Sequence, residues 1–287
     1  MNLKSLLFVP GDSTRKIAKA ADSQADALIF DLEDSVAPAR KPDARIATAT
    51  ALQNASTQQR WVRINPLPTA DCLFDLAAII PAAPDGIVLP KCESGADLVR
   101  LSHYLDALEA AAKLPLGQIK ILPIASETPG SVFQLGSYAG VSPRLAGLTW
   151  GAEDLPAAIG ATQNRKADGS LNDLCRIARS LCLAGAAAAN VPAIETVFPN
   201  FKDLDGLRSY AMQARTEGFS GMMAIHPSQV AVINAVMTPS IEEAAYARRV
   251  IAAFDAFPGA GVVALEGKML DLPHLKQAQR VLAASVN

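Results

Sequence analysis

Residues 86–112 read GIVLPKCESGADLVRLSHYLDALEAAA, and this stretch carries one full unit of the pattern that decides the fold. A short apolar run, 86–89, ends in Pro90-Lys91, and Ser94 then precedes apolar residues at helical spacing up to position 112. Serine is a favoured helix N-cap because its hydroxyl accepts a free backbone N–H of the first turn. The stretch therefore predicts a buried strand followed by a helix.

The same unit recurs along the chain. Strands are expected at 5–9, 27–31, 61–64, 86–89, 120–125, 145–150, 193–198 and 221–225. Helices are expected at 13–23, 42–51, 71–80, 95–112, 131–138, 174–189, 203–217 and 229–236. Eight apolar strands, each followed by a helix, predict an α/β fold of the (β/α)₈ TIM barrel type with parallel strands buried on both faces. A doubly wound open sheet is the alternative, but no GxGxxG follows the first strand.

The alternation of strands and helices ends after residue 237, where Thr238-Pro239-Ser240 marks a boundary. A helix at 241–257, an extended piece at 262–265, then the stretch 267–271, and a last helix after Pro273 are expected beyond it. We therefore divide the chain into a barrel, 1–237, and a C-terminal appendage, 238–287, which we do not count as a second independent domain.

Composition excludes several classes of protein. The 287 residues include 26 Lys and Arg and 28 Asp and Glu, so the excess of basic residues that binds nucleic acids is missing. Hydrophobic residues make up 50% of the chain and charged residues 19%, which argues against disorder. No apolar run reaches the roughly 18 residues of a membrane span, and the N-terminal run is too short for a signal sequence. The four cysteines show no metal-ligand spacing, which is typical of reduced thiols in a cytoplasmic enzyme.

Ionisable residues follow the apolar runs, at the pole where TIM barrels carry their active sites. The candidates are Asp31, Glu33, Asp34, Arg63, Lys91, Glu127, Glu153 and Asp154. Carboxylates that converge on one cleft repel each other unless a cation lies between them. An oxygen-rich set favours Mg²⁺, or Mn²⁺, over Zn²⁺, and Glu127 and Asp154 follow adjacent strands and could share one ion.

Several of these side chains could serve the structure instead of the chemistry. Capping of the next helix explains Asp34 as well as a catalytic role does. Pairing with a nearby cation explains Asp31, Glu33 and Glu153 at least as well as a direct role. Arg63 would be costly unpaired at the end of an apolar strand, so it either pairs with a protein carboxylate or binds a substrate carboxylate through two hydrogen bonds.

Nine short motifs occur in order along nearly the whole chain. They are LFVPGDS, IFDLEDSVAP, WVRIN, VLPKCES, SETPGSV, WGAEDL, RKADGS, AIHPSQ and EGKMLD. Each is weak alone, but the ordered set resembles the citrate lyase β-subunit-like branch of the HpcH/HpaI aldolase family, which includes malyl-CoA, citramalyl-CoA and citryl-CoA lyases.

The resemblance implies roles for individual residues. It implies that Glu127 and Asp154 bind Mg²⁺ and that Arg63 holds the carboxylate end of the substrate. Asp271, which closes the last motif, would be the acid/base, delivered by a neighbouring subunit so that the appendage acts as a lid. Such an enzyme would be a homo-oligomer, commonly a trimer or hexamer.

The sequence departs from the family pattern at the residues expected to bind the CoA part of the substrate. Relatives often carry two arginines near the first helix, associated with the CoA phosphates, whereas this chain has Arg15-Lys16 and then Lys19. Arg15 and Lys16 are therefore the substrate-binding candidates there, with Lys91 nearer the chemistry. The departure leaves an acyl-carrier-protein thioester open as an alternative to free CoA.

The activity implied is reversible, Mg²⁺-dependent Claisen cleavage of a short 3-hydroxyacyl-CoA to acetyl-CoA and a 2-oxo acid. Two alternatives use the same residues. One is an acyl-CoA thioesterase or malate-synthase-like enzyme, and the other is the citryl-carrier-protein lyase subunit of a citrate lyase complex.

Overall fold

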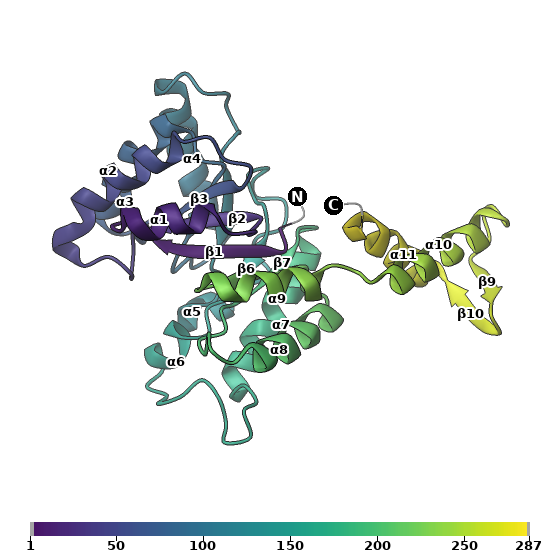
Figure 1. The fold of residues 1–287 in the computed structure, drawn as a ribbon. Helices are drawn as coiled ribbons and strands as arrows, with labels where there is room; N and C mark the ends of the chain where they lie inside the picture. The colour runs from purple at the N-terminus through teal and green to yellow at the C-terminus, as the bar shows by residue number, and fades with distance from the viewer. Residues whose placement is uncertain (1–2, 286–287) are drawn as a thin grey trace. The chain divides into compact units, whose positions relative to one another are not determined.

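The computed structural model describes residues 3–285, which form two compact units, Leu3–Asn234 and 235–285 (Figure 1). The strands are β1 (Ser5–Pro10), β2 (Ala27–Asp31), β3 (Gln59–Arg63), β4 (Gly86–Leu89), β5 (Lys120–Pro123), β6 (Leu148–Thr149), β7 (Ala193–Glu195), β8 (Gly221–Ala224), β9 (Val262–Leu265) and β10 (Lys268–Asp271). The helices are α1 (Thr14–Ala21), α2 (Lys41–Leu52), α3 (Ala70–Ile79), α4 (Gly95–Ala111), α5 (Pro129–Val132), α6 (Asp154–Ala158), α7 (Asp173–Ala188), α8 (Leu204–Glu217), α9 (Pro227–Met237), α10 (Ile241–Asp255) and α11 (Leu272–Ser285), with short 3₁₀ turns at Pro38–Arg40 and Ile80–Ala82.

Strands β1 to β8 of the first unit form a parallel sheet in the order β5-β4-β3-β2-β1-β8-β7-β6. The two ends of this sheet meet, because Ile121 bridges to Leu145 and Ile124 to Thr149 in parallel fashion. The amide of Ala125 donates to the Thr149 carbonyl at 2.8 Å across the same seam. The sheet is thus closed into a (β/α)₈ TIM-like barrel, which confirms the predicted fold and excludes the open-sheet alternative.

Helix α4 begins where its capping residue predicts, since the Ser94 hydroxyl accepts from the Ala96 amide at 3.2 Å. Helix α5 begins two residues before its expected start, where Thr128 and Ser131 form a capping box. These caps satisfy amides that would otherwise lack a partner at the helix start.

Several elements are shorter than the sequence predicts, and the difference is largest at two of them. The helix expected at 131–138 ends at Val132 and continues as tight turns, in which the amides of Phe133, Gln134 and Ser137 bond three residues back. Glycines 130, 136 and 140 disfavour a longer helix there. The strand expected at 145–150 is β6, only two residues long, and the residues around it bond alternately to β5 and to the segment before β7.

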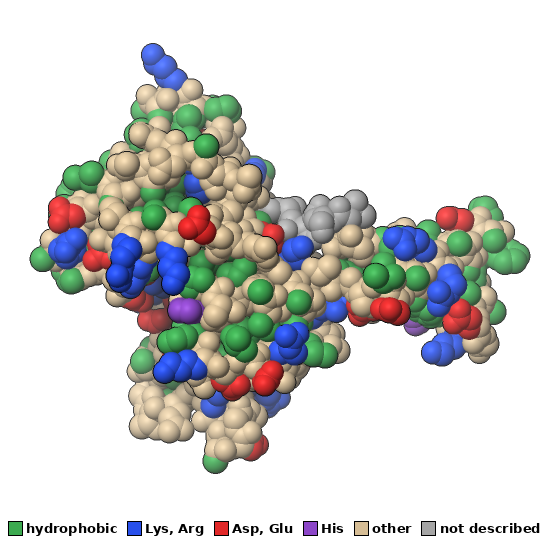
Figure 2. Space-filling model, in the orientation of Figure 1, with side chains coloured by type: hydrophobic (Ala, Val, Ile, Leu, Met, Phe, Trp, Pro, Cys, Tyr) green, Lys and Arg blue, Asp and Glu red, His purple; other side chains and the backbone are tan. Residues whose placement is uncertain are grey.

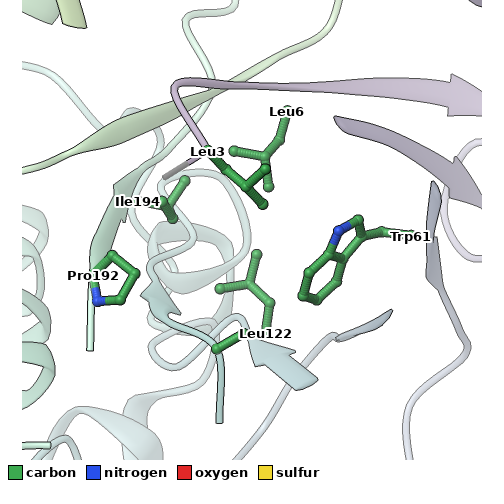
Figure 3. A pocket seen from close by; sticks show the side chains of 7 residues that line it. Leu3, Leu6, Trp61, Leu122, Pro192 and Ile194 are labelled. Atoms are coloured by element: carbon green, nitrogen blue, oxygen red, sulfur yellow. The ribbon is translucent and has the colours of Figure 1, made fainter. Parts of the chain in front are cut away.

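The barrel interior is filled by alternate residues of the strands, as the two-residue period of a strand requires. Leu6, Ile29, Trp61, Leu122 and Met223 are all nearly or fully buried there. Figure 3 shows the side chains around a small apolar pocket, where Trp61 and Leu122 point toward residues that precede or begin other strands. This end of the barrel, at the start of the strands, is apolar.

The second unit has its own small core. Helices α10 and α11 pack against the antiparallel hairpin β9–β10, and Val263 and Leu270 are buried between them. The hairpin turn consists of Glu266 and Gly267, both with positive φ, which matches the twist of the flanking strands. Among residues 3–285, no helix has both the length and the apolar character to cross a bilayer.

Candidate active site

Asp31 and Arg63 lie side by side at the ends of β2 and β3, as Cα partners in the ladder. They share the inward face with Ile29 and Trp61, two residues earlier on each strand. The Nε and Nη2 atoms of Arg63 each donate to a carboxylate oxygen of Asp31 at 2.7 Å, and the guanidinium lies 4.9 Å from the Phe8 ring centre. Burial opposes ionisation of Asp31, but the hydrogen bonds and charge of Arg63 outweigh it and keep the pKa of Asp31 below its usual value.

Glu33 lies between the two cations of the site and is 4% exposed. Its Oε1 lies 2.5 Å from the Lys91 ammonium, and its Oε2 lies 3.2 Å from Arg63 Nη1. The Lys91 ammonium also lies 3.5 Å from an oxygen of Asp154 and 3.8 Å from one of Asp34. Burial nevertheless raises the pKa of Glu33, against the opposing charges of Arg63 and Lys91.

The backbone at Lys91 is strained. Its φ of 47° lies in the left-handed region, which costs a residue other than glycine roughly 1 kcal/mol or more. This conformation lets the Lys91 amide donate to Glu127 Oε2 while its ammonium contacts Glu33. The residue after β4 therefore contributes both its backbone and its side chain to one cluster.

Glu127 follows β5 and is 3% exposed. Burial raises the pKa of Glu127 to about 8, and the charges of Glu33 and Asp154 add to this, while the hydrogen bond from the Lys91 amide opposes it. The backbone of Gly151 packs closely on this side chain, since a Cβ at position 151 would lie 2.5 Å from Glu127 Cγ. Glu127 is thus held firmly in a place where its charge is poorly compensated.

The cluster brings together most of the residues predicted from the strand ends. It consists of Asp31, Glu33, Asp34, Arg63, Lys91, Glu127 and Asp154. Five carboxyl groups face two cations, so the electrostatics favour an added cation. Within residues 3–285, no three His, Cys, Asp or Glu side chains are arranged as a complete cage. A hard ion that takes one or two carboxylates and fills its other positions with water and substrate oxygens, as Mg²⁺ does, fits this donor set.

Two residues that support the acidic turn after β2 were not predicted. The Lys41 ammonium donates to the Leu32 carbonyl at 3.1 Å, and the Asn65 side-chain amide donates to the same carbonyl at 3.0 Å. Asn65 is held in turn by the buried Asp75, which accepts from its backbone and side-chain amides at 2.8 and 2.7 Å. Asn65 closes the WVRIN motif just beyond the end of β3, but its support of this turn was not predicted, and nothing local separates Lys41 from a surface lysine.

Three predicted residues of the first unit lie outside the cluster. Glu153 is exposed and accepts from the Asn164 side chain at 2.9 Å, in place of the pairing expected with Lys91 or Arg63. Arg15 and Lys16 are exposed in the first turn of α1, and Figure 2 shows Lys and Arg side chains on the face of the barrel that carries this helix.

Asp271 belongs to the second unit, at the end of β10. Its Oδ1 lies 2.5 Å from His274 Nδ1. Pairing in the hairpin puts Asp271 opposite Val262 and Met269 opposite Ala264, on the face away from the buried Val263 and Leu270. Val262 is 52% exposed and Met269 72% exposed, so the carboxylate lies on an exposed, apolar face of the hairpin.

A carboxylate-rich cluster at the C-terminal ends of the strands of a (β/α)₈ barrel defines the chain as an enzyme of the barrel class. The chain belongs to the HpcH/HpaI aldolase/citrate lyase family, whose profile matches residues 4–227.

Relatives of known name agree with this family. The chain is 38% identical to a citrate lyase subunit beta-like protein of Mycobacterium tuberculosis, over 98% of this chain and 97% of the relative. It is 35% identical to (3S)-malyl-CoA thioesterase of Cereibacter sphaeroides, over 98% and 93%. It is 30% identical to mitochondrial citramalyl-CoA lyase of Rattus norvegicus, over 99% and 86%.

A solved structure also matches along the whole chain. CitE of M. tuberculosis, crystallised with magnesium, acetoacetate and coenzyme A, superposes with a TM-score of 0.82 at 35% identity and covers 100% of this chain and 99% of its own. These findings confirm the resemblance drawn from the nine motifs, and they make the chain a carbon–carbon lyase related to CoA metabolism.

Proposed function

We propose that the protein is a Mg²⁺-dependent lyase that cleaves a short 3-hydroxyacyl-CoA of the citramalyl-, malyl- or citryl-CoA type, reversibly, into acetyl-CoA and a 2-oxo acid. The observation that carries the proposal is the excess of carboxyl groups over cations at the strand ends, centred on Glu127. The related CitE structure, which holds magnesium, an oxo acid and coenzyme A, supports it.

Glu127 and Asp154 are the proposed Mg²⁺ ligands, with Mn²⁺ as a substitute. A cation held there would supply a Lewis acid for the hydroxyl and carboxylate oxygens of the acid half and would stabilise developing negative charge. Glu127 would have to give up its proton to hold the cation, because burial raises its pKa to about 8. Asp154 is more exposed, with 35% of its side chain accessible, which leaves room for water and substrate oxygens.

Arg63 and Lys91 are the proposed cations for the substrate carboxylate. Asp31 fixes the Arg63 guanidinium through Nε and Nη2, which leaves the two N–H groups of Nη1, beside Glu33, and the second N–H of Nη2 as the remaining donors. Glu33 holds Lys91 in the same way from the other side. The carboxylates Asp31, Glu33 and Asp34 act on the substrate through these two cations, and Glu153 lies farther out.

Asp271 is the proposed proton donor, supplied by a neighbouring copy of the chain. Cleavage breaks the bond between the carbinol carbon and the carbon next to the thioester. The hydroxyl loses its proton as it becomes the oxo group, and the thioester half leaves as an enolate that takes up a proton, so one proton is released and one is consumed. The exposed position of Asp271 on the apolar face formed by Val262, Ala264 and Met269 suits a lid that excludes water on docking. A homotrimer or hexamer would provide that neighbour.

The CoA end of the substrate is assigned to the first helix. Arg15 and Lys16 are exposed there and are the proposed phosphate contacts. All four cysteines are free and buried, which supports a cytoplasmic setting where thiols stay reduced.

Two alternative activities use the same site. Thioester hydrolysis, alone or after condensation, is favoured by the relative named (3S)-malyl-CoA thioesterase. Cleavage of a citryl-carrier-protein thioester, as one subunit of a larger complex, is favoured by the relative named citrate lyase subunit beta-like protein.

The test is product analysis with malyl-CoA, citramalyl-CoA and citryl-CoA, in Mg²⁺ and in EDTA. A lyase releases a 2-oxo acid and acetyl-CoA without free thiol, and EDTA stops it. Free CoA thiol in place of acetyl-CoA would identify a thioesterase. No product from any of the three, but product from a carrier-protein thioester, would identify the complex subunit.

A matched pair of variants assigns the cation site. Asp154→Asn should abolish Mg²⁺-dependent cleavage, whereas Glu153→Gln, one residue earlier and bonded to Asn164, should leave it within about twofold. Equal loss in both variants would contradict the assignment of Asp154.

A further inference from the structure

The segment that carries Asp154 leaves the barrel after only two residues of β6. Beyond Thr149 the sheet ladder ends, and the next side chain, Trp150, is 1% exposed. Its indole Nε1 donates to Glu195 Oε1, at the end of β7, at 2.5 Å. A side-chain hydrogen bond to the neighbouring strand thus replaces the missing ladder.

Glu195 is itself fixed on every side. It is fully buried, and its Oε2 accepts from Arg179 Nε at 2.7 Å. Its Oε1 also accepts from the Tyr210 hydroxyl at 3.0 Å and from the Thr196 amide at 2.9 Å. Arg179 lies 4.7 Å from the centre of the Phe219 ring, which holds the guanidinium in place. A buried carboxylate with this many donors is a rigid anchor.

Gly151 connects the Trp150–Glu195 hydrogen bond to the carboxylate cluster around Glu127. This residue follows Trp150 directly, and its backbone packs so closely on Glu127 that a Cβ would lie 2.5 Å from Glu127 Cγ. Three residues later comes Asp154. The position of Trp150 therefore sets how far the segment stands from Glu127 and where Asp154 begins α6.

We propose that Glu195, acting through the Trp150 indole, is a positioning residue that fixes the spacing of Glu127 and Asp154 and so sets the affinity of this pair for a divalent cation. The inference rests on the proposed function only in taking these two carboxylates as the cation ligands. The proposal gives neither Glu195 nor Trp150 a contact with the cation or the substrate.

Three variants separate positioning from stability. Trp150→Phe keeps an aromatic ring and removes the N–H that reaches Glu195. Tyr210→Phe removes a different donor from the same Glu195 oxygen, without a link to the segment. Trp61→Phe removes an equally buried indole at the apolar end of the barrel.

The experiment is Mn²⁺ binding to the full-length protein, followed by electron paramagnetic resonance, with thermal unfolding measured in parallel and Glu127→Ala as a reference. Loss of an outer partner of a metal site typically weakens binding by roughly 10–100-fold. Trp150→Phe should therefore bind Mn²⁺ roughly tenfold more weakly, while Tyr210→Phe and Trp61→Phe stay within about twofold, whatever their melting temperatures.

Unchanged affinity in Trp150→Phe, or equal weakening in all three variants, would overturn the inference and leave the proposed function standing. A wild-type protein that binds Mn²⁺ no better than Glu127→Ala would instead overturn the proposed cation site, and the inference with it.

Discussion

Two buried ion clusters of the barrel differ in how well their charges are matched. Near the start of β5 and before β6, Glu109 is fully buried and accepts from the amides of Gly117 and Ile119 and from both Nη atoms of Arg144. Burial opposes its ionisation, but the Arg144 guanidinium and these amides outweigh that, and the pKa of Glu109 lies below its usual value. Arg144 also pairs with the half-exposed Asp106, and the cluster joins α4 to two loops.

The cluster at the other end of the strands is unmatched. Glu127 is almost as buried as Glu109 but accepts from a neutral donor, the Lys91 amide, and its pKa rises to about 8. A matched carboxylate serves stability, whereas a buried carboxylate with too little opposing charge is a candidate for ligand chemistry. The difference between the two clusters can be tested by replacing Glu127 and Glu109 with glutamine in turn and comparing the effects on activity and stability.

The largest effect is expected at Glu127. Glu127→Gln should lower the rate of cleavage by roughly 10³-fold or more, because several kcal/mol of charge stabilisation depend on the cation. Its free energy of unfolding at neutral pH should not fall, since the glutamine amide is neutral and has nearly the same shape as the protonated carboxyl group of Glu127. Steady-state kinetics and urea unfolding measure the two quantities. A rate within tenfold of wild type would remove Glu127 from the site.

Asp271→Asn should lower the rate by at least roughly 10²-fold, the usual contribution of a general acid or base. Divalent-cation affinity should be unchanged, because Asp271 is not among the proposed ligands. Calorimetric titration of Mg²⁺ beside the kinetics checks both statements. His274→Ala removes the neighbour of Asp271 while keeping the carboxylate, and it should cost far less. An Asp271→Asn variant with full activity would exclude the proposed proton donor.

Glu109→Gln is the structural counterpart. It leaves the buried Arg144 with the half-exposed Asp106 as its remaining carboxylate partner and should lower the free energy of unfolding by about 2 kcal/mol. The rate of cleavage per folded molecule should stay unchanged. If instead this variant remained stable but lost activity, the distinction between matched and unmatched clusters would fail.

The smallest effect is the pH dependence of cation binding. Below about pH 8 the cation competes with the proton on Glu127, so affinity should rise about tenfold per pH unit from pH 6 and level off above 8. In the absence of cation, the raised pKa has the opposite consequence for folding. Its stabilising contribution is complete below the unfolded value of about 4.3 and is lost as pH rises through 8. Mg²⁺ titrations at pH 6, 7, 8 and 9 measure the first trend, and a flat profile would contradict it.

The sequence predicted the barrel because eight units repeat one signal, and errors of a few residues at each end do not change the count. It predicted most of the cluster for the same reason, since the end of an apolar strand is visible in one dimension. It did not predict that Glu153 faces Asn164 while Asp154 reaches Lys91, because neighbouring residues at a helix start diverge in space.

Contacts between segments that are distant along the chain could not be predicted from the sequence either. The sequence alone does not distinguish Glu109 and Glu195 from Glu127. Only the fold brings Arg144 to Glu109 and Arg179 to Glu195. Which carboxylate is left unmatched is therefore a property of tertiary structure.

The central claim is tested most directly by release of 2-oxo acid from the three hydroxyacyl-CoA thioesters, with wild type, Glu127→Gln and Glu109→Gln assayed side by side at a temperature where all are folded. We expect Mg²⁺-dependent release from at least one thioester by wild type and Glu109→Gln, and none by Glu127→Gln. Release that persists in Glu127→Gln, or that is lost only in Glu109→Gln, would contradict the proposed role of the unmatched cluster.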